Sequence, residues 1–270
     1  MTTVPDAAGV ARTDLSGRVA IVTGASAGVG RAYALALAGA GATVIAAART
    51  VGEAGEGVPA RNTLAEVVLA AEPLAGRIHA RVCDVEIEGD IAATIAETAA
   101  NFGRIDVLVN NAGIMTPFDP FDVSCEDWDQ VMRVNVRAPY LAMRRVAPHM
   151  IRQRSGSIIN ITARAAAFLP KGSRAQATVV YGPSKAALNR LSYFMAEELK
   201  PYGIAVNALS PGVVTTDTAL ALNPRLGESR SAKPPAPETL GPALLCLALQ
   251  TAETLTGQVL HTDDFQKDWP

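Results

Sequence analysis

A tyrosine and a lysine four residues apart are the side chains of this sequence best suited to chemistry. They are Tyr181 and Lys185, in the run Tyr-Gly-Pro-Ser-Lys that opens an apolar helical segment. Residues four apart on a helix share one face, so the ammonium is placed to stabilise a phenolate. A nearby positive charge lowers a tyrosine pKa from its usual value of about 10. The pair could then act as a general acid or base, although most pairs at this spacing are ordinary surface neighbours.

A glycine-rich turn near the N-terminus supplies a second signal. Residues 19–30 read Val-Ala-Ile-Val-Thr-Gly-Ala-Ser-Ala-Gly-Val-Gly, and a strong helix former follows. A buried strand, a glycine turn and a helix start together favour a bound phosphate, because backbone N–H groups and the helix dipole attract an anion. The turn therefore predicts a dinucleotide site, with a ligand-free tight turn as the alternative. The expected cofactor contacts are Gly24, Ser26, Ala27, Gly28, Val29 and Gly30.

The spacing Thr-Gly-x-x-x-Gly-x-Gly resembles the short-chain dehydrogenase/reductase family. Further motifs follow in that family's order, over about residues 15–262: Asn-Asn-Ala-Gly at 110–113, Val-Asn-Val at 134–136, Gly-Ser-Ile-Ile-Asn-Ile at 156–161 and Pro-Gly-Val-Val-Thr-Thr at 211–216. The resemblance implies an NAD(P)-dependent oxidoreductase that transfers a hydride between nicotinamide and a carbonyl or alcohol substrate. The long Thr50–Asn62 connection and the Ala-Ala-Arg-Thr strand end at 47–50 resemble the hydroxysteroid-dehydrogenase-like branch, without fixing a steroid as substrate.

The resemblance also assigns catalytic roles. Tyr181 would transfer the proton, Lys185 would lower its pKa and hold the nicotinamide ribose, and Asn135 would anchor a water that links the lysine to solvent. An asparagine at that place could instead bond a neighbouring main chain. The family usually has a second serine after Asn-Ile, whose hydroxyl bonds the substrate oxygen, but this chain has Ala163 there. The adjacent Thr162 could serve only if a bulge or strand end re-aims its side chain.

The missing serine leaves other functions open. Loss of one such donor typically costs about 3 kcal/mol of transition-state stabilisation, which slows the chemistry without abolishing it. Ser173, in the long segment before the tyrosine, is a second candidate for the role. The alternatives are a cofactor-binding protein of low turnover, such as a redox sensor or scaffold, and a non-redox enzyme on the same fold. The intact tyrosine, lysine, asparagine and nicotinamide motifs argue against both.

The end of the second predicted strand bears on the choice of cofactor. An acid there would bond the adenosine ribose hydroxyls of NAD, but this chain has Ala48 followed by Arg49. A guanidinium suits a 2′-phosphate, so NADP(H) is favoured over NAD(H). The arginine could instead merely lie over the adenine. Ala27 weakens the preference, because NADP-preferring members of the family often carry a second basic residue there.

Further cofactor contacts follow from the resemblance. Asp84 would accept from the adenine amino group, unless it only stabilises a turn. The remaining expected contacts lie after the third, fourth and sixth predicted strands: Val85, Asn111, Ala112, Gly113, Pro211, Gly212, Val214 and Thr216.

Composition excludes several classes of protein. Of the 270 residues, 49% are hydrophobic and the net charge is −2, so the core is ample and no basic field favours nucleic acid or an anionic membrane. No apolar run approaches the roughly 18 residues of a membrane span. Residues 1–14 lack the apolar core of a signal peptide, and we expect a disordered leader. Cys83, Cys125 and Cys246 show no metal or disulfide spacing, so we expect reduced core thiols, no metal and a cytoplasmic location.

Strand-like and helical runs alternate along the whole chain. The expected strands are 18–23, 42–47, 78–83, 105–110, 156–162, 203–209 and 258–261, and the expected helices lie near 28–40, 62–75, 88–102, 125–153, 183–200 and 237–250. This alternation predicts an α/β fold over residues 15–270: a single Rossmann-type domain, with a doubly wound parallel sheet of about seven strands and helices on both faces.

Two expectations concern partners. The long helices at 125–153 and 183–200 carry apolar residues on their outer faces, such as Leu188, Leu191 and Phe194, so we expect a homo-tetramer or homo-dimer, as the resemblance also implies. These residues could instead pack on the sheet. The substrate would be a small alcohol or ketone in a pocket built from the Thr116 side of the fourth loop and the segments 163–180 and 217–237. Asp263 and Asp264 are expected to be surface or capping groups.

Overall fold

The strands form one parallel sheet. The computed structural model describes residues 13–49, 63–115, 121–167, 179–212, 214 and 236–269. Its seven described strands are all parallel, as the alternating pattern predicted, and they join in the order β3-β2-β1-β4-β5-β6-β7. Their bounds are β1 Val19–Thr23, β2 Thr43–Ala48, β3 Arg77–Val82, β4 Val107–Asn110, β5 Gly156–Ile161, β6 Ile204–Ser210 and β7 Val259–His261.

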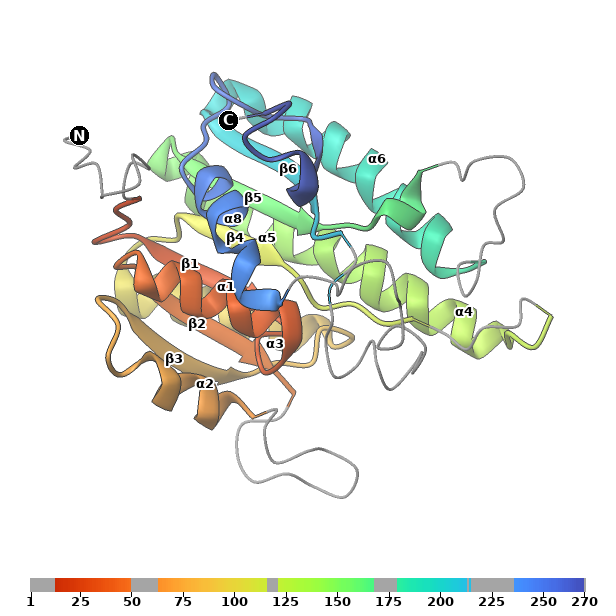
Figure 1. Cartoon of the computed structure of the whole chain (residues 1–270), viewed down its shortest axis with the longest axis horizontal. Helices are drawn as coiled ribbons and strands as arrows, with labels where there is room; N and C mark the ends of the chain where they lie inside the picture. The colour runs from red at the N-terminus through yellow and green to blue at the C-terminus, as the bar shows by residue number, and fades with distance from the viewer. Residues whose placement is uncertain are drawn as a thin grey trace.

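Helices cover both faces of the sheet (Figure 1). On one face, α1 (Gly28–Gly39), α2 (Leu64–Ala71) and α8 (Gly241–Ala248) enclose a core with one side of the strands. On the other face, α3 (Glu88–Phe102), α5 (Ala138–Gln153) and α6 (Tyr181–Leu199) enclose a second core. Every residue of β1, β5 and β6 is buried, which is why these strands appear in the sequence as apolar runs rather than as alternating patterns.

The order of the strands predicts where on the sheet a ligand binds. The chain runs outward from β1 to β3 on one side and from β4 to β7 on the other, so the crossover direction reverses between β1 and β4. The carboxyl ends of parallel strands on either side of such a reversal leave a crevice, and ligands bind there. Two buried asparagines fasten this edge to α6, because Asn110 Nδ2 donates to Asn160 Oδ1 (2.8 Å) and Asn160 Nδ2 donates to Ser192 Oγ (2.8 Å).

The predicted helix at 125–153 is present and unbroken, but it contains a π-helical turn. It consists of α4 (Cys125–Met132), a π-helical turn η1 (Arg133–Arg137) and α5. The predicted helix at 237–250 likewise begins with a 3-10 turn, η5 (Pro237–Leu240), before α8. A wider turn of five residues changes the direction in which side chains leave the helix, and such turns are frequent at functional sites. Asn135 lies in the middle of η1.

Four other expectations concern membrane spans, the cysteines, metals and the N-terminal leader. Within the described residues, no helix is long and apolar enough to cross a membrane. Cys83 is buried and Cys246 half-buried, but Cys125 is exposed at the start of α4, so the expectation of a core thiol is wrong for that residue. In the described part of the chain, no cluster of three or more histidine, cysteine or acidic residues is arranged to hold a metal. The predicted leader falls almost entirely on residues 1–12, outside the described part.

Candidate active site

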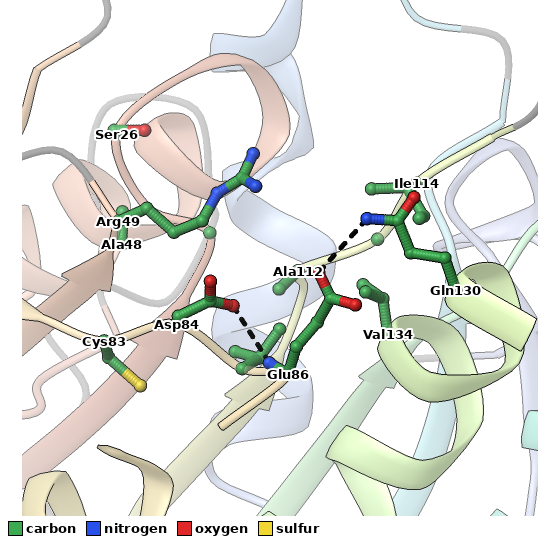
Figure 2. Close-up of a pocket in the computed structure, with 13 residues that line it drawn as sticks. Ser26, Ala48, Arg49, Cys83, Asp84, Glu86, Ala112, Ile114, Gln130 and Val134 are labelled. Atoms are coloured by element: carbon green, nitrogen blue, oxygen red, sulfur yellow. Dashed lines mark hydrogen bonds between the residues drawn. The ribbon is translucent and has the colours of Figure 1, made fainter. Parts of the chain in front are cut away.

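A cavity of about 260 Å³ opens at the crevice between β1 and β4, on the carboxyl edge of the sheet. Figure 2 shows the residues that surround it, which come from the ends of the first four strands and from the helical segment after β4. They are Gly24, Ser26, Ala48, Arg49, Cys83, Asp84, Val85, Glu86, Ala112, Gly113, Ile114, Gln130 and Val134.

The glycine turn after β1 leaves a helix end open for an anion. Gly24 and Gly28 have φ of +63° and +52°, which glycine adopts without strain, and a Cβ on Gly24 would lie 2.9 Å from the Cα of Ala112. Ala27 precedes α1 with extended backbone and offers no capping side chain, and the first turn of α1 holds no acidic residue. The first N–H groups of this helix are therefore available to a pyrophosphate. Val29 packs its side chain against the core, so only its backbone is left for such a contact.

Asn111 has a different role from the one expected. Its Nδ2 donates to the carbonyls of Thr23 (2.9 Å) and Gly24 (3.1 Å), and its side chain does not line the cavity. The Thr23 hydroxyl in turn accepts from the backbone N–H groups of Asn111 (3.0 Å) and Ala112 (3.1 Å). These bonds fix the glycine turn against the loop after β4. Of the Asn-Ala-Gly motif, Ala112 and Gly113 face the cavity.

Arg49 and Asp84 both lie where the cofactor was expected. Arg49 is exposed at the end of β2, and Figure 2 shows its side chain extended over the cavity. Asp84 Oδ1 accepts from the backbone N–H of Glu86 at 3.0 Å, so the turn-stabilising role left open for this residue is present. Its carboxylate also lines the cavity, next to Val85, and remains placed to accept from a base.

A bridge across the far side of the cavity was not foreseen. Glu86 accepts from Gln130 Nε2 (3.2 Å) and from Arg133 Nε (3.4 Å), which joins the loop after β3 to α4 and η1. The partners are 44 and 47 residues apart along the chain. No local motif marks such a contact, so sequence reasoning had no signal for it.

Tyr181 and Lys185 are the first and fifth residues of α6, on one face of the helix as their spacing predicted. Lys185 is 3% exposed, its Nζ donates to the carbonyl of Ile161 at 2.8 Å, and it lies 5.7 Å from the centre of the Tyr181 ring. Burial lowers the pKa of Lys185 to about 8 and raises the pKa of Tyr181 to about 12. The expected lowering of the tyrosine pKa is therefore absent from this structure, because desolvation dominates and the ammonium bonds a strand carbonyl.

Asn135 reaches the same place from η1. It is fully buried, its Oδ1 accepts from the N–H of Ile114 (2.9 Å), and its Nδ2 donates to the carbonyl of Ile114 (2.9 Å) and to Ser184 Oγ (3.0 Å). The main-chain contact that we kept as an alternative is thus present. A Cβ on Gly113 would lie 3.3 Å from both Asn135 Oδ1 and Lys185 Nζ. Glycine at this position therefore lets the loop after β4 pack closely against both groups.

Thr162 is not placed to replace the missing serine. Its hydroxyl donates to the carbonyl of Lys185 (3.4 Å), and the residue is 2% exposed. Strand β5 pairs regularly with β6 up to Ile161, and the N–H of Thr162 continues the ladder to the carbonyl of Leu209 (2.9 Å). No bulge re-aims its side chain. Ala163 follows with extended backbone, half-buried at the strand end.

The expected nicotinamide contacts follow β6. Pro211 and Gly212 are half-buried directly after the strand, and Gly212 has φ +77°. Val214 is buried in the core on the α1 side. Thr216, Ser173 and most of the expected substrate pocket lie outside the described residues.

Known proteins share this sequence pattern and this fold. The short chain dehydrogenase family matches residues 18–226. The 3-oxoacyl-[acyl-carrier-protein] reductase FabG of Thermotoga maritima is 34% identical over 254 residues, which cover 92% of this chain and 97% of that protein. The short-chain reductase protein NovJ of Streptomyces niveus is 35% identical over 257 residues, covering 91% of this chain and 92% of that protein.

Solved structures agree over the same span. A short-chain type dehydrogenase/reductase from Mycobacterium marinum has a TM-score of 0.81 at 30% identity, covering 93% of this chain and 95% of that one. A structure from Beutenbergia cavernae, described as an NAD(P) dependent gluconate 5-dehydrogenase with bound NADP at low occupancy, has a TM-score of 0.78 at 33% identity. It covers 93% of this chain and 97% of that one.

Proposed function

The chain belongs to the short-chain dehydrogenase/reductase family and is an NAD(P)-dependent oxidoreductase, and within that activity we propose that it is an NADP(H)-preferring carbonyl reductase and alcohol dehydrogenase. The observation that carries the proposal is the meeting of Tyr181, Lys185 and Asn135 beside a cavity whose rim holds Arg49 and no acid at Ala48. The low-turnover alternative finds no support, since the related proteins are named as reductases.

Tyr181 is the proposed proton donor. A bound reduced nicotinamide would supply a hydride to the carbonyl carbon of the substrate, and the Tyr181 phenol O–H would give its proton to the carbonyl oxygen, which would yield the alcohol. With a pKa of about 12, the phenol is protonated at neutral pH and suited to donate. With a pKa of about 8, Lys185 carries a proton at pH 7 and has one to return to the tyrosine. A water held near Asn135 would link Lys185 to solvent, as the family resemblance implies.

The cofactor preference rests on charge. The Arg49 guanidinium is exposed at the cavity rim, and among the described residues no carboxylate forms an ion pair with it. It is therefore available to a 2′-phosphate, and Ser26 adds a hydroxyl to the same rim. One structural relative was crystallised with NADP, which agrees with this preference.

The relatives narrow the substrates worth testing. The proteins named above include a reductase of 3-oxoacyl groups and one described as a gluconate dehydrogenase. The first name describes an oxo group near an acyl carbonyl, and the second describes a hydroxy acid, so each substrate carries a second oxygen function. We therefore propose a carbonyl substrate of that kind, and the hydroxysteroid branch and the cytoplasmic location stay predictions.

Self-association also stays a proposal, now with different residues. Leu188 is 1% exposed and Leu191 packs against the core, so these two do not form an outer face. Phe194 is 53% exposed, and Arg190 stacks on its ring at 4.5 Å. An exposed aromatic ring with a cation on its face is a surface suited to a second copy of the chain. Light scattering that shows a monomer at micromolar concentration would remove this proposal.

The test of function is NADPH consumption against a panel of ketones, aldehydes and 3-oxo esters. Tyr181→Phe should remove nearly all turnover and leave NADPH affinity, measured by fluorescence titration, within about twofold, because the ring still packs and only the proton is lost. Tyr202→Phe, at an exposed tyrosine beyond the end of α6, is the matched control. An active Tyr181→Phe variant would overturn the catalytic assignment.

A further inference from the structure

The turn after β5 carries an arginine directly beyond the missing serine hydroxyl. Arg164 begins the short 3-10 turn η2 (Arg164–Ala166), and this turn packs against α6, whose first residue is Tyr181. The family's serine contacts the substrate oxygen from the position of Ala163. Arg164 therefore extends from the catalytic edge, one residue from that position.

An ion pair across this edge holds the guanidinium. Arg164 Nη2 lies 2.8 Å from Asp263 Oδ2 and 3.9 Å from Asp264 Oδ1. Both carboxylates belong to η6 (Thr262–Asp264), the turn that directly follows β7. The pair therefore joins the carboxyl ends of β5 and β7.

The Asp263 carboxylate also lies over the turn after β6, the strand between β5 and β7 in the sheet. A Cβ on Gly212 would lie 3.0 Å from Asp263 Oδ2, so the acid rests on the turn after β6. Thr262 Oγ1 also donates to the carbonyl of Ser210, the last residue of β6, at 3.2 Å. The dark blue C-terminal segment accordingly lies beside β6 in Figure 1. Arg164 is thus held at the rim formed by the ends of three adjacent strands.

Stability does not account for this contact. The two side chains are 48% and 51% exposed, and such solvated pairs typically contribute about 0–1 kcal/mol to stability. Both contacts use one nitrogen, Nη2, and within the described residues no acceptor bonds Nε or Nη1 of Arg164. The guanidinium therefore keeps hydrogen-bond donors on its other nitrogens.

On the basis of the proposed carbonyl reductase activity, we propose that Arg164 is a specificity-determining residue that binds a second oxygen of the substrate, close to the carbonyl that is reduced. Asp263 holds the Arg164 guanidinium at the rim. The remaining N–H groups of the guanidinium donate to that oxygen. A substrate with two oxygen functions near each other would be anchored at one and reduced at the other.

The charges around Arg164 favour a neutral oxygen. Asp263 and Asp264 face the guanidinium, and Lys267 Nζ donates to the carbonyl of Asp263 at 2.8 Å. Two cations and two anions leave no net positive charge to attract a free carboxylate. The structure therefore favours the ester, thioester or amide carbonyl of a 3-oxo compound over a 3-oxo acid.

Three substrates of similar size test the proposal: ethyl acetoacetate, acetoacetate and butyl methyl ketone. The parent protein should have a kcat/KM for the ester about tenfold or more above the other two, the typical worth of a hydrogen bond to a charged group. Arg164→Leu should lower the value for the ester by about tenfold and change that for the ketone by less than about threefold. Asp263→Asn should act in the same direction, because the guanidinium is no longer held.

Two further variants separate contact from mere positioning. Arg145→Leu removes a similarly exposed arginine, paired with Glu88 at 2.7 Å between α5 and α3, and should leave all three substrates unaffected. The exchanged pair Arg164→Asp/Asp263→Arg keeps the ion pair but moves the guanidinium, so it should not recover the ester preference. Affinity for NADPH and the melting temperature check that each variant is folded.

The possible failures are distinguishable. A parent protein without ester preference, an equal loss on ester and ketone in Arg164→Leu, or recovery in the exchanged pair would each overturn the role of Arg164. A parent protein that oxidises NADPH with no carbonyl compound of the wider panel would instead overturn the proposed function, and this inference with it.

Discussion

Lys185 should make the protein less stable below pH 8 than above it. Burial at 3% exposure lowers its pKa from 10.5 to about 8, so the folded state disfavours the ammonium while the unfolded chain keeps it. Between these two pKa values the unfolded state binds more protons, and the free energy of unfolding therefore rises with pH. Below pH 8 the full cost is present, which the two pKa values put at about 3 kcal/mol.

Lys185→Met removes this pH dependence while keeping an apolar stem of similar length. The variant loses the bond to the carbonyl of Ile161, and leaving that buried acceptor unpaired costs about 1–3 kcal/mol. At pH 7 the variant should therefore be as stable as the parent protein or slightly more stable. From pH 7 to pH 10 the parent should gain about 2.5 kcal/mol relative to the variant, because only the parent titrates this lysine.

Urea unfolding without cofactor, at one protein concentration and at pH 7, 8, 9 and 10, measures the difference. Burial raises the pKa of Tyr181, Cys83 and Cys246, and each of these groups lowers stability as the pH rises through its unfolded pKa. They are the same in both proteins and cancel in the difference. Lys200→Met, at an exposed lysine just beyond α6, controls for the substitution itself. A difference that is constant within about 0.5 kcal/mol over this range would refute the reasoning.

Three further predictions test the site. Arg49→Ala should weaken NADPH binding about tenfold or more and NADH binding less than twofold, as fluorescence titration would show; equal affinities in the parent protein would contradict the preference. Gly113→Ala should push its methyl group against Lys185 Nζ and Asn135 Oδ1 and lower kcat about tenfold, and an unchanged kcat would argue that these two side chains need not hold their positions. Thr162→Val should alter kcat less than about threefold, because its hydroxyl bonds a main-chain carbonyl; a hundredfold loss would restore Thr162 as the substrate donor.

Local patterns in the sequence sufficed to place the sheet. Strands such as β1 and β6 are buried on both faces, so their runs of branched apolar residues differ plainly from the helices between them. The glycine turn and the Tyr-x-x-x-Lys pair are also local, because the residues of each motif lie close together in the sequence. The Rossmann-type order and the position of both motifs at one edge followed from these elements.

What the sequence did not reveal depends on contacts distant along the chain. Glu86 and Gln130 meet only after folding, and nothing beside either residue predicts the other. The outward face assigned to Leu188 was wrong because a helix packed on a sheet buries one stripe, and the periodicity alone did not say which stripe. The π-helical turn around Asn135 has no sequence signature of its own.

The buried and exposed parts of the site differ in how much stability the protein loses when one of their residues is substituted. Lys185, Asn135 and Asn111 are each held by main-chain groups at the ends of strands or in the loops that follow them. Substituting one of them would leave a buried carbonyl or N–H without its partner, so these positions permit little exchange. The Arg164–Asp263 pair is half-exposed and contributes little to stability, so the rim can change without unfolding the protein. Substrate choice is therefore expected to depend on the rim, and hydride transfer on the buried layer beneath it.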